Sequence, residues 1–198
     1  MRLSDSNSAP AITGLILAGG RATRMQNQDK GLQQLHGVSL IEHVLARLTP
    51  QVASVLINAN RNQASYARLG YPVISDIRSD FAGPLAGVEA GLAVCNSPLL
   101  LTVPCDTPYL PLDLAERLLA ALMLTNADIA MACTGELSAL QSQPVFCLLK
   151  PVHLSQLQQY LDGGGRKMDA WFGALAVAKV LFTDDAEFTN MNTLEQLK

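Results

Sequence analysis

The chain has 198 residues, of which 49% are hydrophobic and 16% charged, and its formal net charge is −3. A chain of this length buries roughly 70% of its unfolded surface, enough for one hydrophobic core, and the low charge excludes a disordered polyelectrolyte. There is no basic excess for binding nucleic acid, and no apolar run reaches the ~20 residues needed to cross a membrane.

The first ten residues are polar and lack the apolar stretch of a signal peptide. We expect a loose tail over residues 1–10, one domain over residues 11–198, and a cytoplasmic location. The four cysteines lie among apolar neighbours and form no C-x-x-C pair, which favours buried thiols over a metal site or disulfides: Cys95, Cys105, Cys133 and Cys147.

The first half of the chain alternates short apolar runs with amphipathic segments. Ser39 followed by Glu42 is the capping-box pattern that begins a helix, and apolar residues follow it at helical spacing. Strands are predicted at residues 12–17, 52–57, 73–74 and 99–103, and further helices at 63–69 and 86–94. This half therefore has a repeated strand–helix pattern.

The second half continues the alternation. Pro111 has the position that proline favours in the first turn of a helix, with a stripe of leucines behind it. Strands are predicted at 129–132, 145–149 and 177–182, helices at 154–161 and 168–175, and a C-terminal helix cap at Asn192 with Glu195. Because uniformly apolar strands are buried on both faces, we expect an α/β protein with a parallel sheet and helices on each side.

Ligands of such sheets bind outside the carboxyl ends of the strands, so the polar residues that follow the strands are the candidate site. These residues are glycines, cations, carboxylates and amides: Gly19, Gly20, Arg24, Lys30, Asn58, Asp76, Asp106, Asn190 and Asn192. They include no histidine, nucleophile-elbow serine or redox cysteine pair. Covalent catalysis therefore has no obvious nucleophile.

The first candidate is the turn Ala18-Gly19-Gly20. Glycines directly after a strand let backbone N–H groups point at a phosphate, and Arg24 and Lys30 can add charge there. The pattern matches neither the dinucleotide fingerprint nor the Walker loop, which disfavours a dehydrogenase or a P-loop kinase. On these residues alone, a plain turn remains open.

Two carboxylates follow strands. Asp106 lies between two prolines at the end of a very apolar strand, where a hard oxygen ligand suits Mg²⁺ bound together with substrate phosphates. A turn-forming aspartate next to proline is the competing interpretation, and it is favoured for Asp76 taken alone.

Three further segments each have a structural and a functional interpretation. The run from Gly83 to Gly87 is either a turn entering a helix or a backbone surface for a base or sugar. Asn190 and Asn192 share one side of an extended segment, or else form an Asn-rich turn. Residues 163–167, GGGRK, end a helix or bind an anionic second substrate.

Taken together, four segments resemble the signatures of molybdenum cofactor guanylyltransferases. LAGGRATRM at 17–25 with Asp29-Lys30 is similar to that family's first signature, and residues 83–87, 104–108 and 190–193 resemble the next three in order. The similarity runs from about Ile12 to the C-terminus. Four matches in order are far more specific than any one alone.

The resemblance implies a Rossmann-like three-layer α/β/α nucleotidyltransferase fold with a mostly parallel sheet. It implies transfer of GMP from GTP to molybdenum-bound molybdopterin, with release of pyrophosphate. It also implies a divalent metal ion, which would be Mg²⁺, with Mn²⁺ as a possible substitute. The GTP-binding half would span about residues 11–110 and the pterin-binding half about 111–198. The implied partners are GTP and molybdenum-bound molybdopterin, with molybdenum-insertion proteins and molybdoenzyme chaperones as further candidates.

The resemblance also implies residue roles. Asp106, Lys30 and Arg24 would be catalytic, with Asp106 binding the metal. The GTP-binding residues would be Leu17, Ala18, Gly19, Gly20, Lys30, Asn58, Asp76, Gly83, Gly87 and Asp106. Asn190 and Asn192 would close the phosphate and metal site, and Gln143, Arg166 and Lys167 are candidates for the pterin side by position and charge.

The sequence departs from the family pattern at one position. The family has glycine directly after the R-M pair, whereas this chain has Gln26. Three alternatives remain open at this point: a molybdopterin cytidylyltransferase, a sugar-nucleotide nucleotidyltransferase, and a non-catalytic nucleotide or cofactor carrier. Gly19 in the first turn favours the guanylyl enzyme, because the cytidylyl relatives tend to have Ala-Ala-Gly there.

Overall fold

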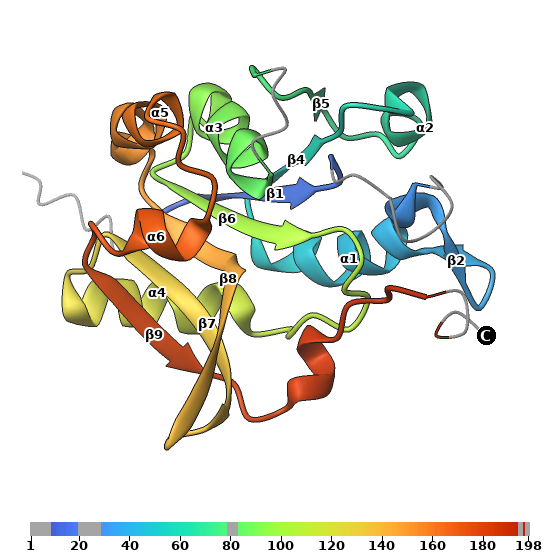
Figure 1. Ribbon diagram of the computed structural model, residues 1–198. Helices are drawn as coiled ribbons and strands as arrows, with labels where there is room; N and C mark the ends of the chain where they lie inside the picture. The colour runs from blue at the N-terminus through green and yellow to red at the C-terminus, as the bar shows by residue number, and fades with distance from the viewer. Residues whose placement is uncertain (1–8, 20–28, 79–82, 194–195, 197–198) are drawn as a thin grey trace, which may run out of the picture.

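A computed structural model describes residues 9–19, 29–78, 83–193 and 196. Its centre is a seven-stranded sheet in the order β5-β4-β1-β6-β8-β7-β9 (Figure 1). The strands are β1 (Ile12–Leu17), β4 (Ser54–Asn58), β5 (Val73–Ile74), β6 (Leu99–Pro104), β7 (Ile129–Glu136), β8 (Ala139–Leu149) and β9 (Val177–Leu181). A separate hairpin pairs β2 (Gln34–Leu35) with β3 (Val38–Ser39).

Helices and short 3-10 turns connect the strands. The helices are α1 (Leu40–Leu48), α2 (Gln63–Ala67), α3 (Pro84–Val94), α4 (Leu114–Thr125), α5 (Leu154–Asp162) and α6 (Met168–Phe172). The 3-10 turns are η1 (Lys30–Leu32), η2 (Thr49–Gln51), η3 (Pro151–His153) and η4 (Asp185–Phe188). In the part of the chain that the structure describes, no helix has the length and apolar character to cross a membrane.

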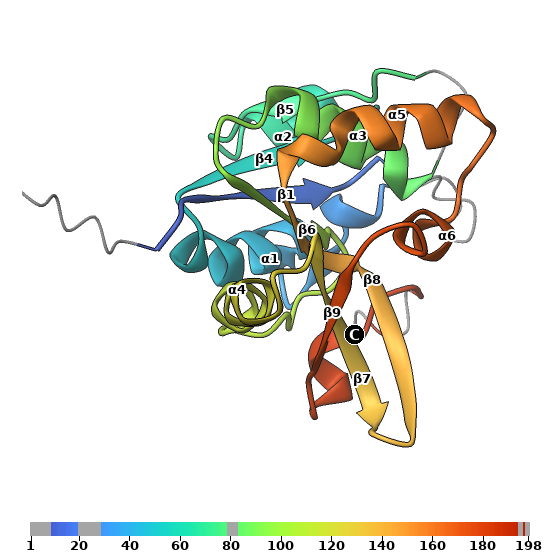
Figure 2. The ribbon, with the colours of Figure 1, turned by 90° about the vertical axis from the view of Figure 1, so that its left-hand side faces the viewer.

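The sheet has helices on both faces. On one face, α1 and α4 pack against Ile16 and Leu101 in the larger core; on the other, α3, α5 and α6 pack against Leu15 and Leu100 (Figure 2). Successive strand residues thus enter opposite cores, as the two-residue period of a strand requires. The predicted three-layer α/β fold is confirmed.

The strand pairings in the described sheet are parallel except for those of β8, which runs antiparallel to both β6 and β7. The sheet is therefore mostly parallel, as the family resemblance implies, whereas the apolar runs alone predict a parallel sheet and do not reveal the antiparallel strand. The reason is the short connection between β7 and β8, since two residues can join antiparallel strands only. The resulting hairpin extends well beyond the apolar runs predicted at 129–132 and 145–149.

Several local predictions hold. The backbone N–H of Ser39 donates to the Glu42 carboxylate at 3.0 Å, which is half of the predicted capping box at the start of α1. All four cysteines are free thiols, three of them buried.

Helix α4 begins at Leu114, so Pro111 precedes the helix rather than lying in its first turn. The cap predicted with Glu195 falls outside the described residues.

An irregularity in β8 brings its backbone toward the edge of the sheet where the candidate residues gather. Between Met131 and Ala132 of β7 the register on β8 jumps from Cys147 to Gln143, so the intervening residues 144–146 bulge out of the ladder. Proline lacks the N–H needed for pairing, and Pro144 begins this bulge. The Thr102 hydroxyl of β6 donates to the carbonyl of Val145 at 2.6 Å and so fixes the bulge in place.

Candidate functional site

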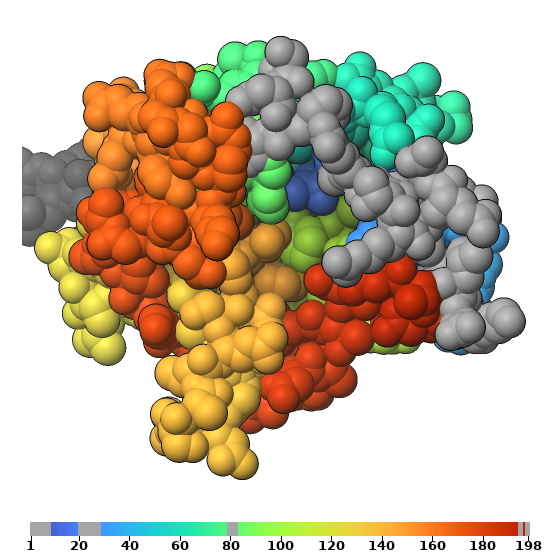
Figure 3. All heavy atoms as spheres, in the orientation of Figure 1, coloured from blue at the N-terminus to red at the C-terminus, as the bar shows by residue number. Residues whose placement is uncertain are grey.

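A cleft lies at the carboxyl ends of β1, β4, β5 and β6. Its volume is about 440 Å³, within the range of roughly 300–1,000 Å³ that small-molecule sites occupy. Figure 3 shows the hollow on this face of the molecule. It is lined by Leu17, Ala18, Gly19, Asp29, Lys30, Asn58, Asp76, Gly83, Pro84, Pro104, Cys105, Asp106, Val145 and Asn190.

Lys30 forms the centre of one side of the cleft. Its ammonium lies 3.1 Å from the Asp106 carboxylate and donates to the amide oxygen of Asn192 at 2.6 Å. Lys30 comes from η1, Asp106 from the turn after β6, and Asn192 from the C-terminal segment. The fold thus brings three separate sequence signatures to one charged group.

The C-terminal segment is held on both of its sides. The backbone N–H of Met191 donates to the carbonyl of Asp106 at 2.8 Å, and its side chain is buried with Leu35 and Leu40. The Thr107 hydroxyl donates to the amide oxygen of Asn190 at 2.6 Å. Met191 therefore faces a small apolar cluster while the asparagines on either side contact site residues, the alternation expected of an extended segment.

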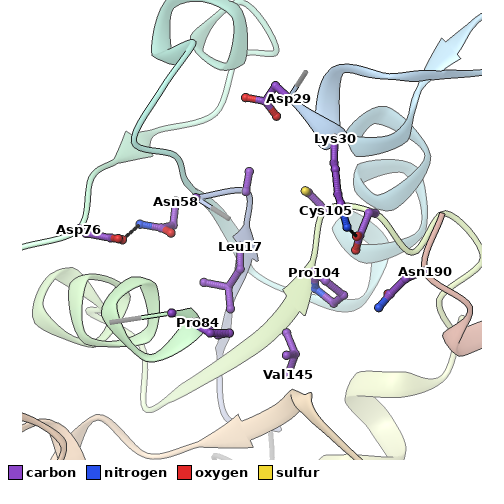
Figure 4. A pocket seen from close by; sticks show the side chains of 14 residues that line it. Leu17, Asp29, Lys30, Asn58, Asp76, Pro84, Pro104, Cys105, Val145 and Asn190 are labelled. Carbon is purple, nitrogen blue, oxygen red and sulfur yellow. Dashed lines mark hydrogen bonds and ion pairs between the residues drawn. The ribbon is translucent and has the colours of Figure 1, made fainter. Parts of the chain in front are cut away.

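Asp76 and Asn58 line the opposite side of the cleft, and Asn60 supports Asp76 from behind. The amide nitrogen of Asn58 donates to one Asp76 carboxylate oxygen at 2.9 Å, and that of Asn60 donates to the other at 2.7 Å. Figure 4 shows Asn58 and Asp76 on one side, Lys30 on the other, and Leu17 between them. A cation and a carboxylate thus occupy opposite ends of one cleft.

Gly83 and Gly87 have different surroundings in the structure. Gly83 lines the cleft at the start of α3 with φ of +70°, a conformation that side-chain-bearing residues rarely adopt. Gly87 is buried one turn further on and does not line the cleft; a Cβ there would overlap the side chain of Asn58. In the structure Gly87 makes room for Asn58, and the expectation that it lets a base or ribose approach stays a prediction.

Asp29 lies beside Lys30 and has two partners of its own. The Tyr66 hydroxyl donates to its carboxylate, and the Asn62 amide donates to it at 3.1 Å. Burial, and then the nearby Cys105 and Asp29, raise the pKa of Tyr66 far above its ordinary value. Tyr66 therefore stays protonated and serves as a fixed hydrogen-bond donor.

Cys105 lines the cleft, but its chemistry argues against a nucleophile. Burial raises the pKa of its thiol well above the ordinary value, and the neighbouring Asp106 and Asp29 carboxylates add to the effect. A thiol held in its protonated form is a poor nucleophile. This agrees with the sequence prediction that the site acts without a covalent intermediate.

The donor set of the cleft fits a hard divalent cation. The Asp106 carboxylate is mostly buried yet lines the cleft, and Asn190 lines it as well, with its amide oxygen accepting from the Thr107 hydroxyl at 2.6 Å. Among the described residues, no three or more His, Cys, Asp or Glu side chains gather into a metal cluster. One carboxylate with substrate phosphates is the way Mg²⁺ is commonly held, since this ion keeps few protein ligands.

Some predicted residues lie elsewhere. Gly20 and Arg24, as well as Gln26, fall outside the described residues. Gln143, Arg166 and Lys167 do not line the cleft: the Gln143 amide donates to Thr134 at 3.2 Å, and the Arg166 guanidinium donates to the Leu161 carbonyl at 3.0 Å. Their assignment to the pterin side rests on position and charge.

Sequence reasoning missed several residues of this site: Asp29 as a lining carboxylate, Asn60, Tyr66, Pro84 and Val145. The sequence did contain a signal for Asn60, because it lies two residues after Asn58, the last residue of β4. For Tyr66 and Val145 there was none, because each is an apolar-looking residue within a predicted helix or strand.

The chain matches the family model described as the MobA-like NTP transferase domain over residues 14–177. It is 52% identical over 188 residues to a protein of Cupriavidus necator named molybdenum cofactor guanylyltransferase, and the match covers 94% of each chain. A protein of the same name from Bordetella petrii is 51% identical over 187 residues, covering 94% of this chain and 95% of the relative.

Solved structures share the fold at low sequence identity. Molybdopterin-guanine dinucleotide biosynthesis protein A from Archaeoglobus fulgidus superposes with a TM-score of 0.72 at 20% identity, covering 93% of this chain and 94% of that one. The 4-diphosphocytidyl-2C-methyl-D-erythritol synthase of Anaerococcus prevotii gives a TM-score of 0.75 at 12% identity, covering 96% and 93%. The fold is therefore shared by proteins whose names point to different nucleotides.

Proposed function

The chain belongs to the family of MobA-like NTP transferase domains, and we propose that it transfers GMP from GTP to the terminal phosphate of molybdenum-bound molybdopterin. The observation that carries this proposal is the convergence of Lys30, Asp106 and Asn192 on one cleft, in a chain 52% identical to a guanylyltransferase. The products are pyrophosphate and the guanine dinucleotide form of the cofactor.

The chemistry needs no nucleophile from the protein. The terminal phosphate of molybdopterin attacks the α-phosphorus of GTP, a new P–O bond forms, and the bond to the β-phosphate oxygen breaks as pyrophosphate leaves. Lys30 supplies a fixed positive charge beside these oxygens, and catalysis comes from positioning and electrostatics. The raised pKa of Cys105, which keeps the nearest thiol neutral, agrees with this direct transfer.

The polarity of the cleft orients GTP. The triphosphate belongs at the Lys30 end, beside the turn Leu17-Ala18-Gly19 that lines the cleft, with Gly20 and Arg24 completing the signature. The nucleoside belongs at the Asp76 end, where a carboxylate can accept hydrogen bonds from N–H or O–H donors. Asn58 and Gly83 line the same end.

We assign the metal to Asp106. When bound there with the phosphates of GTP, Mg²⁺ offsets negative charge on the phosphate oxygens, and Mn²⁺ can replace it. Asn190 and Asn192 close this side of the cleft around Asp106 and Lys30. Lys30 holds the Asp106 carboxylate at 3.1 Å and so limits its rotation in the absence of ligand.

The second substrate belongs to the other half of the chain. We propose that residues 11–110 hold GTP and that residues 111–198 hold the pterin, with Gln143, Arg166 and Lys167 as its candidate contacts. Val145 and Asn190 already extend the later half into the cleft. Hand-over to molybdenum-insertion proteins and molybdoenzyme chaperones, and a cytoplasmic location, stay predictions.

Pyrophosphate release tests the proposal. Purified protein is mixed with molybdenum-loaded molybdopterin and Mg²⁺, and GTP, CTP and ATP are supplied in parallel reactions. The proposal expects release with GTP, abolished by EDTA. Release with CTP alone would instead identify a cytidylyltransferase, and GTP binding without release would favour a carrier.

A further inference from the structure

Asn60 makes a two-point contact with Asp76. Its amide nitrogen donates to the Asp76 carboxylate at 2.7 Å, and its amide oxygen accepts from the Asp76 backbone N–H at 2.9 Å. A side chain that bonds both the backbone and the carboxylate of one residue closes a ring. The backbone position and the side-chain rotamer of Asp76 are thereby fixed together.

The same side chain also packs against the first turn of the cleft. A Cβ added at Gly19 would lie 2.9 Å from the Asn60 amide nitrogen and 3.0 Å from the Asn58 amide oxygen. Asn60 therefore lies between the phosphate-side turn and the nucleoside-side carboxylate. It does not itself line the cleft.

Each Asp76 carboxylate oxygen accepts one hydrogen bond from an asparagine amide, one oxygen from Asn58 and the other from Asn60. A carboxylate accepts about four hydrogen bonds, so each oxygen keeps capacity for a ligand donor. An acceptor held in a single orientation binds more tightly than one whose rotamers must be ordered by the ligand. Asp76 is set by its neighbours before any ligand arrives.

We propose that Asn60 is a positioning residue for the nucleoside of GTP, acting through Asp76. The inference rests on the proposed function, in which Asp76 contacts the nucleoside. Because this contact is made before and during the reaction alike, its loss raises KM for GTP and leaves kcat nearly unchanged. Asn60 is therefore a determinant of nucleotide affinity rather than a catalytic residue.

Two substitutions separate this role from simple space filling. Asn60→Asp keeps the volume and the acceptor for the Asp76 N–H, but it removes the donor and places a second negative charge beside Asp76. Asn60→Ala removes the donor and the volume but adds no charge. A positioning donor predicts that Asn60→Asp is the more damaging variant, whereas a space-filling residue predicts the reverse order.

The experiment measures kcat and KM for GTP by pyrophosphate release, and the dissociation constant for GTP by titration without acceptor. For Asn60→Ala we expect KM and the dissociation constant to rise about tenfold, with kcat within about twofold. For Asn60→Asp the rise should be larger still. Asn96→Asp, the same change at an exposed position between α3 and β6, is the matched control and should behave as wild type.

The outcomes are distinct. GTP affinity within twofold of wild type in Asn60→Asp, or a milder effect of Asn60→Asp than of Asn60→Ala, overturns the inference. If Asn60→Ala does not fold, the isosteric Asn60→Asp decides alone. If wild-type protein releases no pyrophosphate from GTP, the proposed function fails, and the titration still decides whether Asn60 sets the affinity for GTP.

Discussion

The Lys30 ammonium and the Asn192 amide oxygen are 2.6 Å apart, although 162 positions separate these residues in the chain. The same ammonium also bonds Asp106, so two of its three donors are engaged within the protein. Among the residues that the structure describes, no further partner takes the third donor, which with the positive charge can serve a ligand in the cleft. Lys30 is therefore both preorganised and still able to bind an anion.

Replacing Lys30 should impair the use of GTP. For Lys30→Ala we expect kcat/KM for GTP to fall by about 100-fold, because a fixed cation beside the phosphates is removed. Lys179→Ala, an exposed lysine on β9, is the matched control. Steady-state pyrophosphate release measures both, and an unchanged kcat/KM in Lys30→Ala would contradict the phosphate role.

Asp106 should be required for turnover but not for folding. Asp106→Asn keeps the shape of the side chain and removes the charge that would hold the metal, so we expect turnover to fall at least about 100-fold. The melting temperature should stay close to that of wild type. Asp113→Asn, at a half-exposed aspartate before α4, controls for the substitution itself. Near-normal turnover at saturating Mg²⁺ would rule out the metal assignment.

Met191 should act on the reaction through its neighbours. Met191→Ala removes a buried side chain from the cluster with Leu35 and Leu40, at a cost of about 2 kcal/mol in unfolding free energy. The asparagines on either side lose their anchor, so kcat should fall about tenfold. Met123→Ala, at an exposed methionine of α4, should change neither quantity. Urea unfolding and pyrophosphate release are the measurements.

Gly87→Ala should destabilise the protein although it lies within a helix. In a free helix the change to alanine stabilises by about 1 kcal/mol. Here the added Cβ overlaps Asn58 and crowds Leu17, so we expect a loss of about 1–3 kcal/mol and weaker GTP binding. Thermal unfolding decides the sign, and a raised melting temperature would show that Asn58 can move aside freely.

Stability should fall at alkaline pH. Burial raises the pKa of Cys147 from 9.0 to about 12, so the folded state keeps a proton that the unfolded state loses above about pH 9. The contribution of this thiol to the unfolding free energy is then complete below about pH 9 and is lost between pH 9 and 12, by up to ~1.4 kcal/mol per pH unit. Cys147→Ala should reduce this slope. Denaturant titrations from pH 7 to 10.5 measure it.

Much of the central sheet could be predicted from sequence because its strands are short and apolar. The run from Ile12 to Leu17 coincides with β1, and Val73-Ile74 coincides with β5. The outer part of the β7–β8 hairpin could not be predicted, because its polar residues Gln141 and Ser142 do not follow an apolar pattern. Its pairing depends on the partner strand rather than on its own sequence.

The candidate site was predictable where residues directly follow strands. Asn58, Asp76 and Asp106 all meet at the cleft, as the rule for parallel sheets requires. The supporting contacts were not predictable, since Tyr66 reaches Asp29 from a helix 37 positions away. Such a contact depends on how α2 packs, and no local pattern records it.

The backbone hydrogen bond from Met191 to Asp106 can form only late in the synthesis of the chain. The strands that form the floor of the cleft are complete once β6 has emerged from the ribosome. The lysine and aspartate then wait for more than eighty residues before the segment that restrains them is made. The nascent chain therefore lacks the restraint on Asp106 until Met191 has been made, so the geometry of the site depends on one of the last segments of the chain to be synthesised.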